Sequence, residues 1–189
     1  MPGDLYLSYW LRGFTATNML RHFAAALSQF PFSRISPRLT LRVYALEYAE
    51  PPLLERGFEG PEIEEVLHAA AEFGNDDCAY EISAAWDIWQ WSEDVREWIL
   101  APSMVRITCY APLFPSDFGE QIRFDLGDED HFVPPDLARA AIHTTLRSNI
   151  RSLIHMGKDL DQVLKFERRA LWSESGQNLA ERLEQELRA

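Results

Sequence analysis

The sequence has little that marks a membrane span, an export signal or a disulfide framework. Its two cysteines, Cys78 and Cys109, stand far apart and fit neither a zinc spacing nor a CxxC pair. This favours buried free thiols over a disulfide. No apolar run approaches the ~20 residues that span a bilayer, and the first residues lack the basic and apolar stretches of a signal peptide. These absences predict a soluble, cytoplasmic protein.

Short motifs with a defined mechanism are also missing. The sequence contains no GxGxxG or P-loop to cradle phosphate, no GxSxG nucleophile turn and no HExxH zinc helix. Neither cysteine has the basic neighbours that lower a thiol pKa, and Cys78 follows two aspartates. We therefore nominate no catalytic residue, expect no cofactor and favour a binding protein over an enzyme.

Charge is unevenly distributed along the chain. The net charge is −12, and residues 47–135 hold 21 acidic residues against four arginines. Such a segment repels phosphate backbones, which disfavours nucleic-acid binding. It would suit a basic partner, such as a toxin or nuclease that this protein antagonises, although solubility alone explains it as well.

Apolar periodicity predicts alternating elements without an internal repeat. Alternation of apolar and polar residues predicts strands, over about 4–12, 39–46, 78–91, 99–111 and 121–126. Helical spacing and cap residues predict five helices. The first runs from a cap at 15–18 to 29, the second over about 61–73, the third over 137–156 with Gly157 at its end, the fourth from 159 onward and the fifth over 175–188.

This order predicts an α+β fold. We expect a mixed or antiparallel sheet of about five strands with helices on one face. The chain opens β-α-β, and a right-handed crossover would make those two strands parallel. Residues 1–157 would form the sheet domain with the long helix, and residues 158–189 a C-terminal helical extension packed on that domain.

Each predicted strand has two different faces, because successive side chains point to opposite sides. One parity is apolar and should pack against the helices. The other mixes aromatic and charged residues and is our candidate binding platform: Tyr6, Trp10, Arg42, Tyr44, Asp87, Trp89, Trp91, Arg106 and Tyr110. Trp, Tyr and Arg are the residues that anchor interfaces.

Three arrangements of this second face stay open. The C-terminal helices or a partner chain could cover it, a ligand could bind it, or water could solvate it. In the solvated arrangement Arg106 and Arg123 pair across strands with Glu81, Asp87 or Asp125. Asp87 could also lie in a cleft, although a pair with Arg106 is favoured.

A cluster of acids follows the last predicted strand. Asp128, Asp130 and His131 could ligate a divalent cation, or a crowded carboxylate there could serve as a general acid. An ordinary acidic turn between strand and helix explains the same residues and is favoured.

The sequence thus predicts a non-catalytic binding or interaction module that uses the aromatic and Arg-rich sheet face or the acidic surface. The partner would be another protein or a second copy of the chain in a homodimer. A carboxylate- or metal-assisted enzyme with a site at Asp128–His131 is the alternative, and an acidic antagonist of a basic partner is another.

Overall fold

A computed structural model describes residues 3–46, 51–132 and 144–174. It confirms an α+β fold and a β1-α1 start, and it shows a single antiparallel sheet of seven strands. No helix in the described ranges has both the length and the apolar character needed to cross a bilayer. The strands are β1 (Asp4–Leu11), β2 (Leu39–Ala45), β3 (Leu54–Phe58), β4 (Cys78–Ser92), β5 (Glu97–Tyr110), β6 (Ile122–Asp128) and β7 (Phe166–Ser173).

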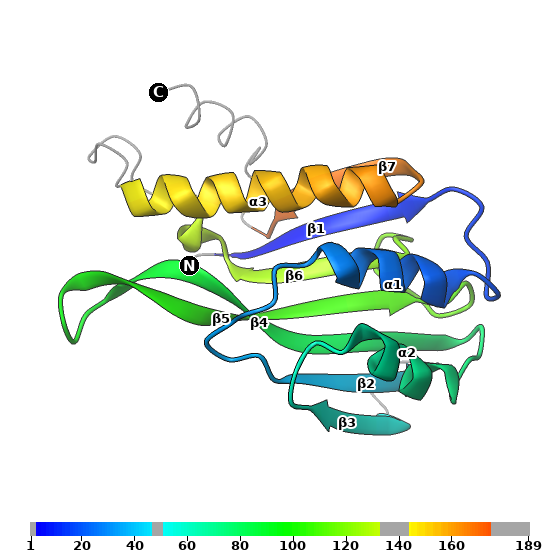
Figure 1. Ribbon diagram of the computed structural model, residues 1–189. Coiled ribbons are helices and arrows are strands. Elements are labelled where there is room, and N and C mark those ends of the chain that lie inside the picture. The colour runs from blue at the N-terminus through cyan, green and yellow to red at the C-terminus, as the bar shows by residue number, and fades with distance from the viewer. Residues whose placement is uncertain (1–2, 47–50, 133–143, 175–189) are drawn as a thin grey trace.

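The strand order is β3-β2-β4-β5-β6-β1-β7, and every neighbouring pair is antiparallel. The first strand therefore lies between β6 and β7, which come much later in the chain. Four antiparallel steps separate β1 from β2, so these strands run in the same direction. They are not neighbours, however, because β6, β5 and β4 lie between them (Figure 1).

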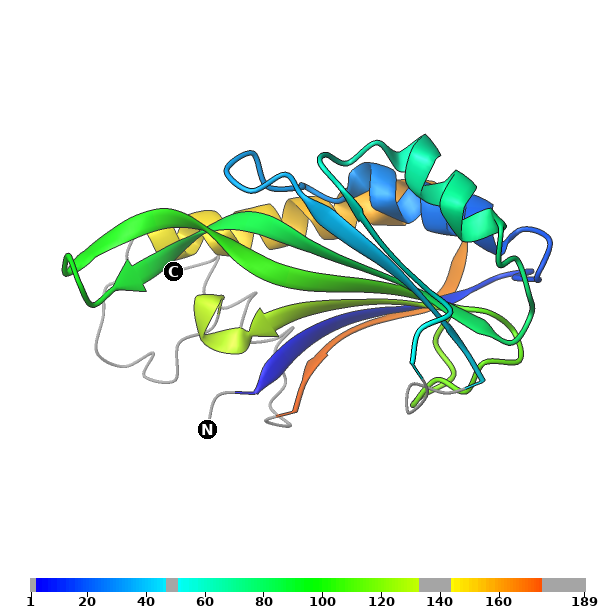
Figure 2. The same ribbon diagram turned by 90° about the horizontal axis from the view of Figure 1, so that it is seen from below.

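The three helices lie on one side of the sheet (Figure 2). They are α1 (Met19–Gln29), α2 (Ile63–Ala71) and α3 (Thr144–Val163), and a short 3-10 helix, η1 (Glu129–His131), follows β6. The apolar parity of the strands packs beneath them, with Tyr9, Tyr80 and Phe124 among its fully buried side chains. Removing this apolar surface from water is the main driving force for the fold.

Two strands lie where the sequence predicts other structure. No strand was predicted over 54–58, yet Leu54–Phe58 pairs along β2. α3 continues through Gly157 to Val163, so the predicted helix end at Gly157 and the new helix from Asp159 are wrong. Strand β7 then pairs along β1. Tertiary pairing overrode weak local signals at both edges of the sheet.

The predicted domain boundary between residues 157 and 158 falls inside α3. β7, which follows α3, belongs to the same sheet as β1. The predicted helix over 137–156 is present from Thr144 on, and its first part lies outside the described residues, as does the predicted helix over 175–188.

The hairpin of β4 and β5 projects beyond the other strands (Figures 1 and 2). β4 pairs with β2 only as far as Ser83, and β5 pairs with β6 only from Arg106 on. We call residues 84–105 the arm. The helix side of the arm contacts α3, and none of the three described α-helices lies on its other side.

Candidate functional site

The sheet face away from the helices, here called the open face, carries its polar residues in rows across the strands. Strand register places Arg42 opposite Glu81, Glu81 opposite Thr108, and Thr108 opposite Arg123. The next row runs through Ser83, Arg106, Asp125 and Tyr6. Side chains in such a row are direct cross-strand neighbours, so their charges interact.

These two rows enclose a cavity of about 450 Å³, here called the open-face pocket. Seven side chains from β2, β4, β5 and β6 line it: Arg42, Tyr44, Glu81, Arg106, Thr108, Arg123 and Asp125. This size is within the range of small-molecule sites. Three arginines and two carboxylates leave the lining with a formal charge of +1, in a protein whose net charge is −12.

Each arginine of the pocket is anchored by a carboxylate. Arg106 pairs with Asp125, and Arg42 donates to Glu55 over 2.9 Å and to the Ser83 hydroxyl over 2.9 Å. A guanidinium has five N–H donors, so these bonds orient the arginines and leave donors for a ligand.

Arg123 is the most enclosed of the three. Its Nη1 donates to Asp117 over 2.9 Å and to the buried Glu120 over 3.2 Å. Its guanidinium carbon lies 5.3 Å from the ring centre of Tyr110 and 5.8 Å from that of Tyr6. Ion pairs and cation–π contacts together fix this cation at the β6 wall of the pocket.

Electrostatic coupling within the pocket shifts two pKa values upward. Burial opposes the charged form of Arg106, but the adjacent Asp125 carboxylate outweighs it and raises the Arg106 pKa. Partial burial and the Glu81 carboxylate raise the pKa of Tyr44. Arg106 therefore stays a cation and Tyr44 a neutral phenol at physiological pH.

The floor of the open-face pocket consists of Glu81 and Thr108, which are only 9% and 4% exposed. Of the described residues, none donates a hydrogen bond to the Glu81 carboxylate; its charged contact is Arg42, with 3.6 Å between Nη1 and Oε1. The Thr108 hydroxyl likewise has no hydrogen bond to a described residue. Both residues are largely buried, but their side-chain oxygens still reach the pocket, where water or a ligand can bond them.

Of the nine platform residues predicted from the sequence, three line the pocket: Arg42, Tyr44 and Arg106. Tyr110 lies beside it, against Arg123. Trp89 and Trp91 lie on the arm, on paired positions opposite Leu100 and Trp98.

Tyr6 and Trp10 lie opposite Trp172 and Arg168 of β7, a strand that the sequence did not predict. Tyr6 stacks on Trp172 of β7, with ring centres 4.3 Å apart. The Arg168 guanidinium lies 4.2 Å from the Trp10 ring centre, and the Trp10 Nε1–H donates to the Phe118 carbonyl over 3.1 Å. β7 thus extends this end of the open face as an edge strand, and the loop before β6 lies against it. Cover by the C-terminal helices was one of the three arrangements left open.

Asp87 has a different partner from the one predicted. Its Oδ2 accepts from the backbone N–H of Arg34 over 2.8 Å and of Ile35 over 3.3 Å, and the Ser33 hydroxyl donates to its Oδ1. Arg106 pairs with Asp125 instead, as one of the alternatives proposed for it. Register explains the difference, because Asp87 lies opposite Pro102 and Arg106 opposite Ser83.

Of the remaining pocket residues, Glu81, Arg123 and Asp125 were placed on this face but not in the site, and Thr108 shares their parity. Parity alone identifies which face they share, whereas register decides that they are neighbours. That register is set by pairing between segments far apart in the sequence.

The acidic cluster after β6 caps local structure. Asp128 Oδ1 accepts from the Asp130 backbone N–H over 2.9 Å at the start of η1, and Glu129 is buried. Within the described residues, no three His, Cys, Asp or Glu side chains are arranged to hold a metal ion. The cation site at Asp128, Asp130 and His131 stays a prediction without geometric support.

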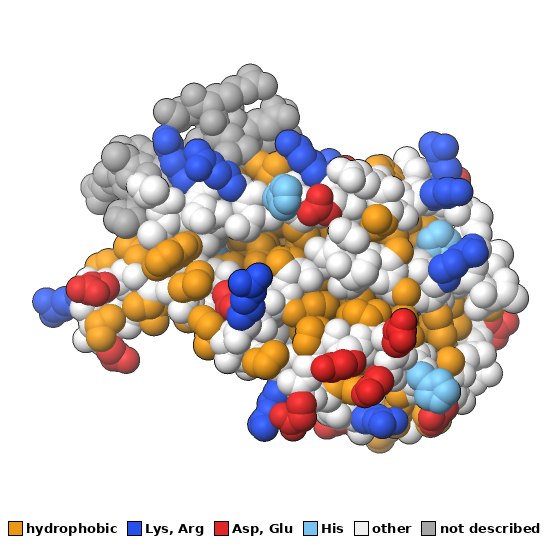
Figure 3. Space-filling view, viewed as in Figure 1, with side chains coloured by type: hydrophobic (Ala, Val, Ile, Leu, Met, Phe, Trp, Pro, Cys, Tyr) orange, Lys and Arg blue, Asp and Glu red, His pale blue; other side chains and the backbone are white. Residues whose placement is uncertain are grey.

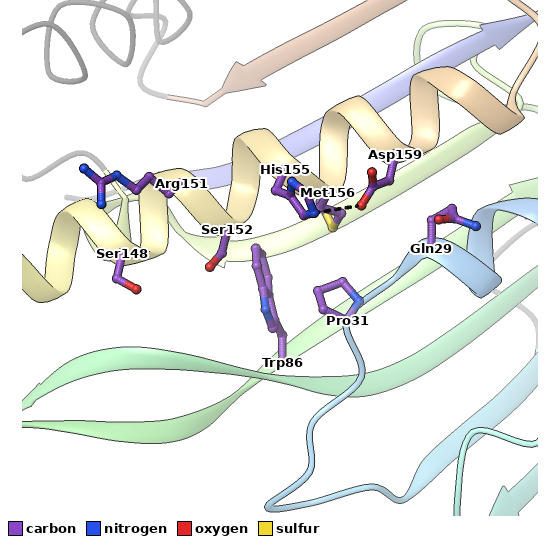
Figure 4. Close-up of a pocket in the computed structure, with 9 residues that line it drawn as sticks. All are labelled: Gln29, Pro31, Trp86, Ser148, Arg151, Ser152, His155, Met156 and Asp159. Carbon is purple, nitrogen blue, oxygen red and sulfur yellow. Dashed lines mark ion pairs between the residues drawn. The ribbon is translucent and has the colours of Figure 1, made fainter.

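A second cavity, about 400 Å³ in volume, lies on the helix side between α3 and the end of α1. Figure 4 shows Trp86 extending from β4 towards α3, with Pro31 next to it and Gln29 at the end of α1. The polar wall of this cavity is exposed: His155 is 80% exposed and pairs with Asp159 over 3.4 Å. Apolar surface shows between the helices in the same region (Figure 3).

The two cavities differ in what they offer a ligand. On the helix side, the floor residues Trp86 and Met156 are almost fully buried in the core, and the polar groups remain in water. In the open-face pocket, polar groups with unused hydrogen-bonding capacity are themselves buried. Polar interactions are stronger where water is excluded, so the open-face pocket is the better candidate site.

No similarity to a known protein supplies a function for this pocket. No family model, curated protein or solved structure matches the chain. The chemistry of the open-face pocket therefore follows from its own residues.

Proposed function

We propose that this protein is a non-catalytic binding module whose open-face pocket takes a small, polar, charged molecule. The observation that carries this proposal is the convergence of three anchored arginines and two nearly buried carboxylates on one cavity, from four adjacent strands. Side chains mounted on neighbouring strands are held more precisely than side chains on loops. The proposal keeps the binding role and the sheet face expected from the sequence.

The mixture of charges selects the kind of ligand. An apolar molecule would remove water from Glu81 without giving its carboxylate a hydrogen bond, and the nearest cation, Arg42, is 3.6 Å away. A polyanion would meet the carboxylates of Glu81 and Asp125 in the pocket, and it would also meet a strongly acidic protein. A small molecule that carries both hydrogen-bond donors and an anionic group satisfies both sets of charges.

Thermal-shift measurements on the whole chain test this function. The probes are amino acids, dicarboxylates, sugar phosphates and polyamines, each at millimolar concentration. A ligand at 100 times its dissociation constant adds about 2.7 kcal/mol to folding stability, which raises Tm by roughly 5–10 °C for a chain this size.

The variant Arg106→Ala should lose the ligand-induced shift, measured against its own ligand-free Tm. Arg38→Ala is the matched control, because Arg38 pairs with Glu59 at the exposed edge of the sheet and does not line the pocket. Equal shifts in Arg106→Ala and the wild type would contradict the proposal.

A second candidate function, self-association, is favoured by the arm. On its open face Trp91, Leu100 and Met104 are 48%, 46% and 64% exposed, and their cross-strand positions form one apolar strip. Contiguous apolar surface of this kind marks interaction sites. We propose a second copy of the chain as its partner. The one acidic residue on this face of the arm, Asp87, is already bonded by Ser33 and by the backbone N–H groups of Arg34 and Ile35, so the strip meets its own copy with less repulsion than the −12 net charge imposes elsewhere.

Sedimentation equilibrium tests self-association. The wild type should sediment as a dimer, and Leu100→Lys should shift it to a monomer. Leu113→Lys is the control, because Leu113 is 68% exposed, more than Leu100, and lies outside the arm. A wild type that remains monomeric at 100 times the concentration used for the thermal shifts would exclude this second function. The acidic antagonist of a basic partner stays a prediction from charge alone.

A further inference from the structure

The floor of the open-face pocket constrains the ligand more closely than its walls do. This inference rests on the proposed function and concerns the same pocket. Glu81 and Thr108 are direct cross-strand neighbours, both buried, and neither side chain has a hydrogen bond to a described residue. By contrast, Asp125 is fully engaged by Arg106 and by the Gly127 backbone N–H, which donates over 3.2 Å.

Glu81 therefore offers a carboxylate that accepts no hydrogen bond from a described residue, at a place where a bound ligand would displace water. A carboxylate accepts hydrogen bonds only, so its partner must be a donor, and a cationic donor gives the strongest bond. The contact with Arg42 is 3.6 Å long and shared with Glu55 at 2.9 Å, so it leaves most of this capacity unused. The Thr108 hydroxyl beside it can accept from the same donor.

Arg106 lies diagonally across from Glu81, one row along the sheet. Register places Ser83 opposite Arg106, and Ser83 is two residues from Glu81 on the same strand face. Diagonal neighbours of this kind have Cβ atoms about 7–8 Å apart. That separation accommodates a headgroup whose cationic and anionic ends lie next to each other. Arg106 is itself half exposed to the pocket, with donors beyond the one that binds Asp125.

We propose that the open-face pocket recognises a small molecule with an amino-acid-type zwitterionic headgroup, whose ammonium binds Glu81 and Thr108 and whose carboxylate binds Arg106. A bare dicarboxylate would give Glu81 no hydrogen-bond donor and would place a second anion next to it. The three arginines of the pocket outnumber its two carboxylates. A bare amine would therefore leave this excess positive charge without an anion. The zwitterion satisfies both ends at once.

Isothermal titration calorimetry with L-glutamate and glutarate tests this assignment, since the two probes differ by the ammonium group. L-glutamate should bind at least tenfold more tightly to the wild type. Glu81→Gln keeps the size of the side chain and should reduce that preference to about threefold or less, because a charge-assisted bond becomes a neutral one. Thr108→Val should weaken L-glutamate binding by about three- to tenfold, the value of one neutral hydrogen bond.

Circular dichroism and the urea midpoint of each variant establish that it is folded, and Arg38→Ala again serves as the matched control. If glutarate binds the wild type as tightly as L-glutamate, and Glu81→Gln changes neither, the zwitterion assignment is overturned while the binding function stands. If neither probe binds at 10 mM, the zwitterion assignment also fails. The proposed function fails with it only when the whole thermal-shift panel is silent too.

Discussion

Asn149 of α3 bonds both backbone groups of Trp89 on β4. Its Oδ1 accepts from the Trp89 N–H over 2.9 Å, and its Nδ2 donates to the Trp89 carbonyl over 2.8 Å. The same Nδ2 donates to the His131 carbonyl over 2.9 Å. One buried amide thus takes the place of a neighbouring strand where β2 has ended, and it attaches the arm to the helix layer.

Asn149→Ala should lower the free energy of unfolding by about 2–4 kcal/mol, because it leaves buried backbone groups without partners. Urea unfolding measures the change. Ser148→Ala, one residue away and exposed on the same helix, should stay within about 0.5 kcal/mol of the wild type. Equal effects of the two substitutions would contradict this role of Asn149.

Asp87 organises the loop between α1 and β2. Asp87→Ala should destabilise the protein by about 1–3 kcal/mol, since the Ser33 hydroxyl and two backbone N–H groups lose their acceptor. Hydrogen exchange at the amides of Arg34 and Ile35 should accelerate with it. Asp94→Ala, in the exposed turn of the arm, is the control. Unchanged exchange at both amides would show that Asp87 acts elsewhere.

The two cysteine thiols should resist modification in the folded protein. Both are buried and free, and burial raises the pKa of Cys109 well above its ordinary value. Burial and then the neighbouring Asp77 raise that of Cys78. Ellman's reagent at pH 8 should therefore titrate almost no thiol until guanidinium unfolds the chain, and then two. Rapid reaction of either thiol under native conditions would contradict the burial.

His22 should make stability depend on pH in the weakly acidic range. Partial burial, then Arg21 and Lys165, lower its pKa below 6.5, so the unfolded chain binds the proton first as pH falls. Stability from His22 is present above pH 6.5 and is lost as pH falls from there through the folded-state pKa. Urea midpoints from pH 7 to 5 should fall less steeply in His22→Gln. A parallel pH dependence of variant and wild type would assign the slope to other groups.

The candidate site shows how far local patterns reach. Parity placed Arg42, Tyr44 and Arg106 on one face of the sheet, and the structure has them in one pocket. Parity could not place Trp91 outside that pocket, because position along a strand and projection beyond the sheet depend on where neighbouring strands end. It also could not bring Arg123 next to Thr108, since this requires the register of β5 with β6.

The same limit explains β7. β7 has three charged residues and one serine among its apolar residues, and it follows a strong helical pattern in the sequence. No local pattern therefore marks a strand there. Pairing along β1, with Trp172 stacked on Tyr6, decides its conformation. Edge strands are half exposed, so their sequences carry a weaker alternation than central ones.

The sequence by itself determined that the strands have one apolar and one polar face, because alternation of side chains is a local property of extended backbone. It also determined which residues form the core beneath the helices. Only the tertiary structure decided the strand order, in which Asp4 pairs with Asp128 and Tyr6 with Trp172. Such pairings join segments more than 120 residues apart and are fixed by packing of the whole sheet, and they are what turn a polar face into a pocket with Glu81 and Thr108 at its floor.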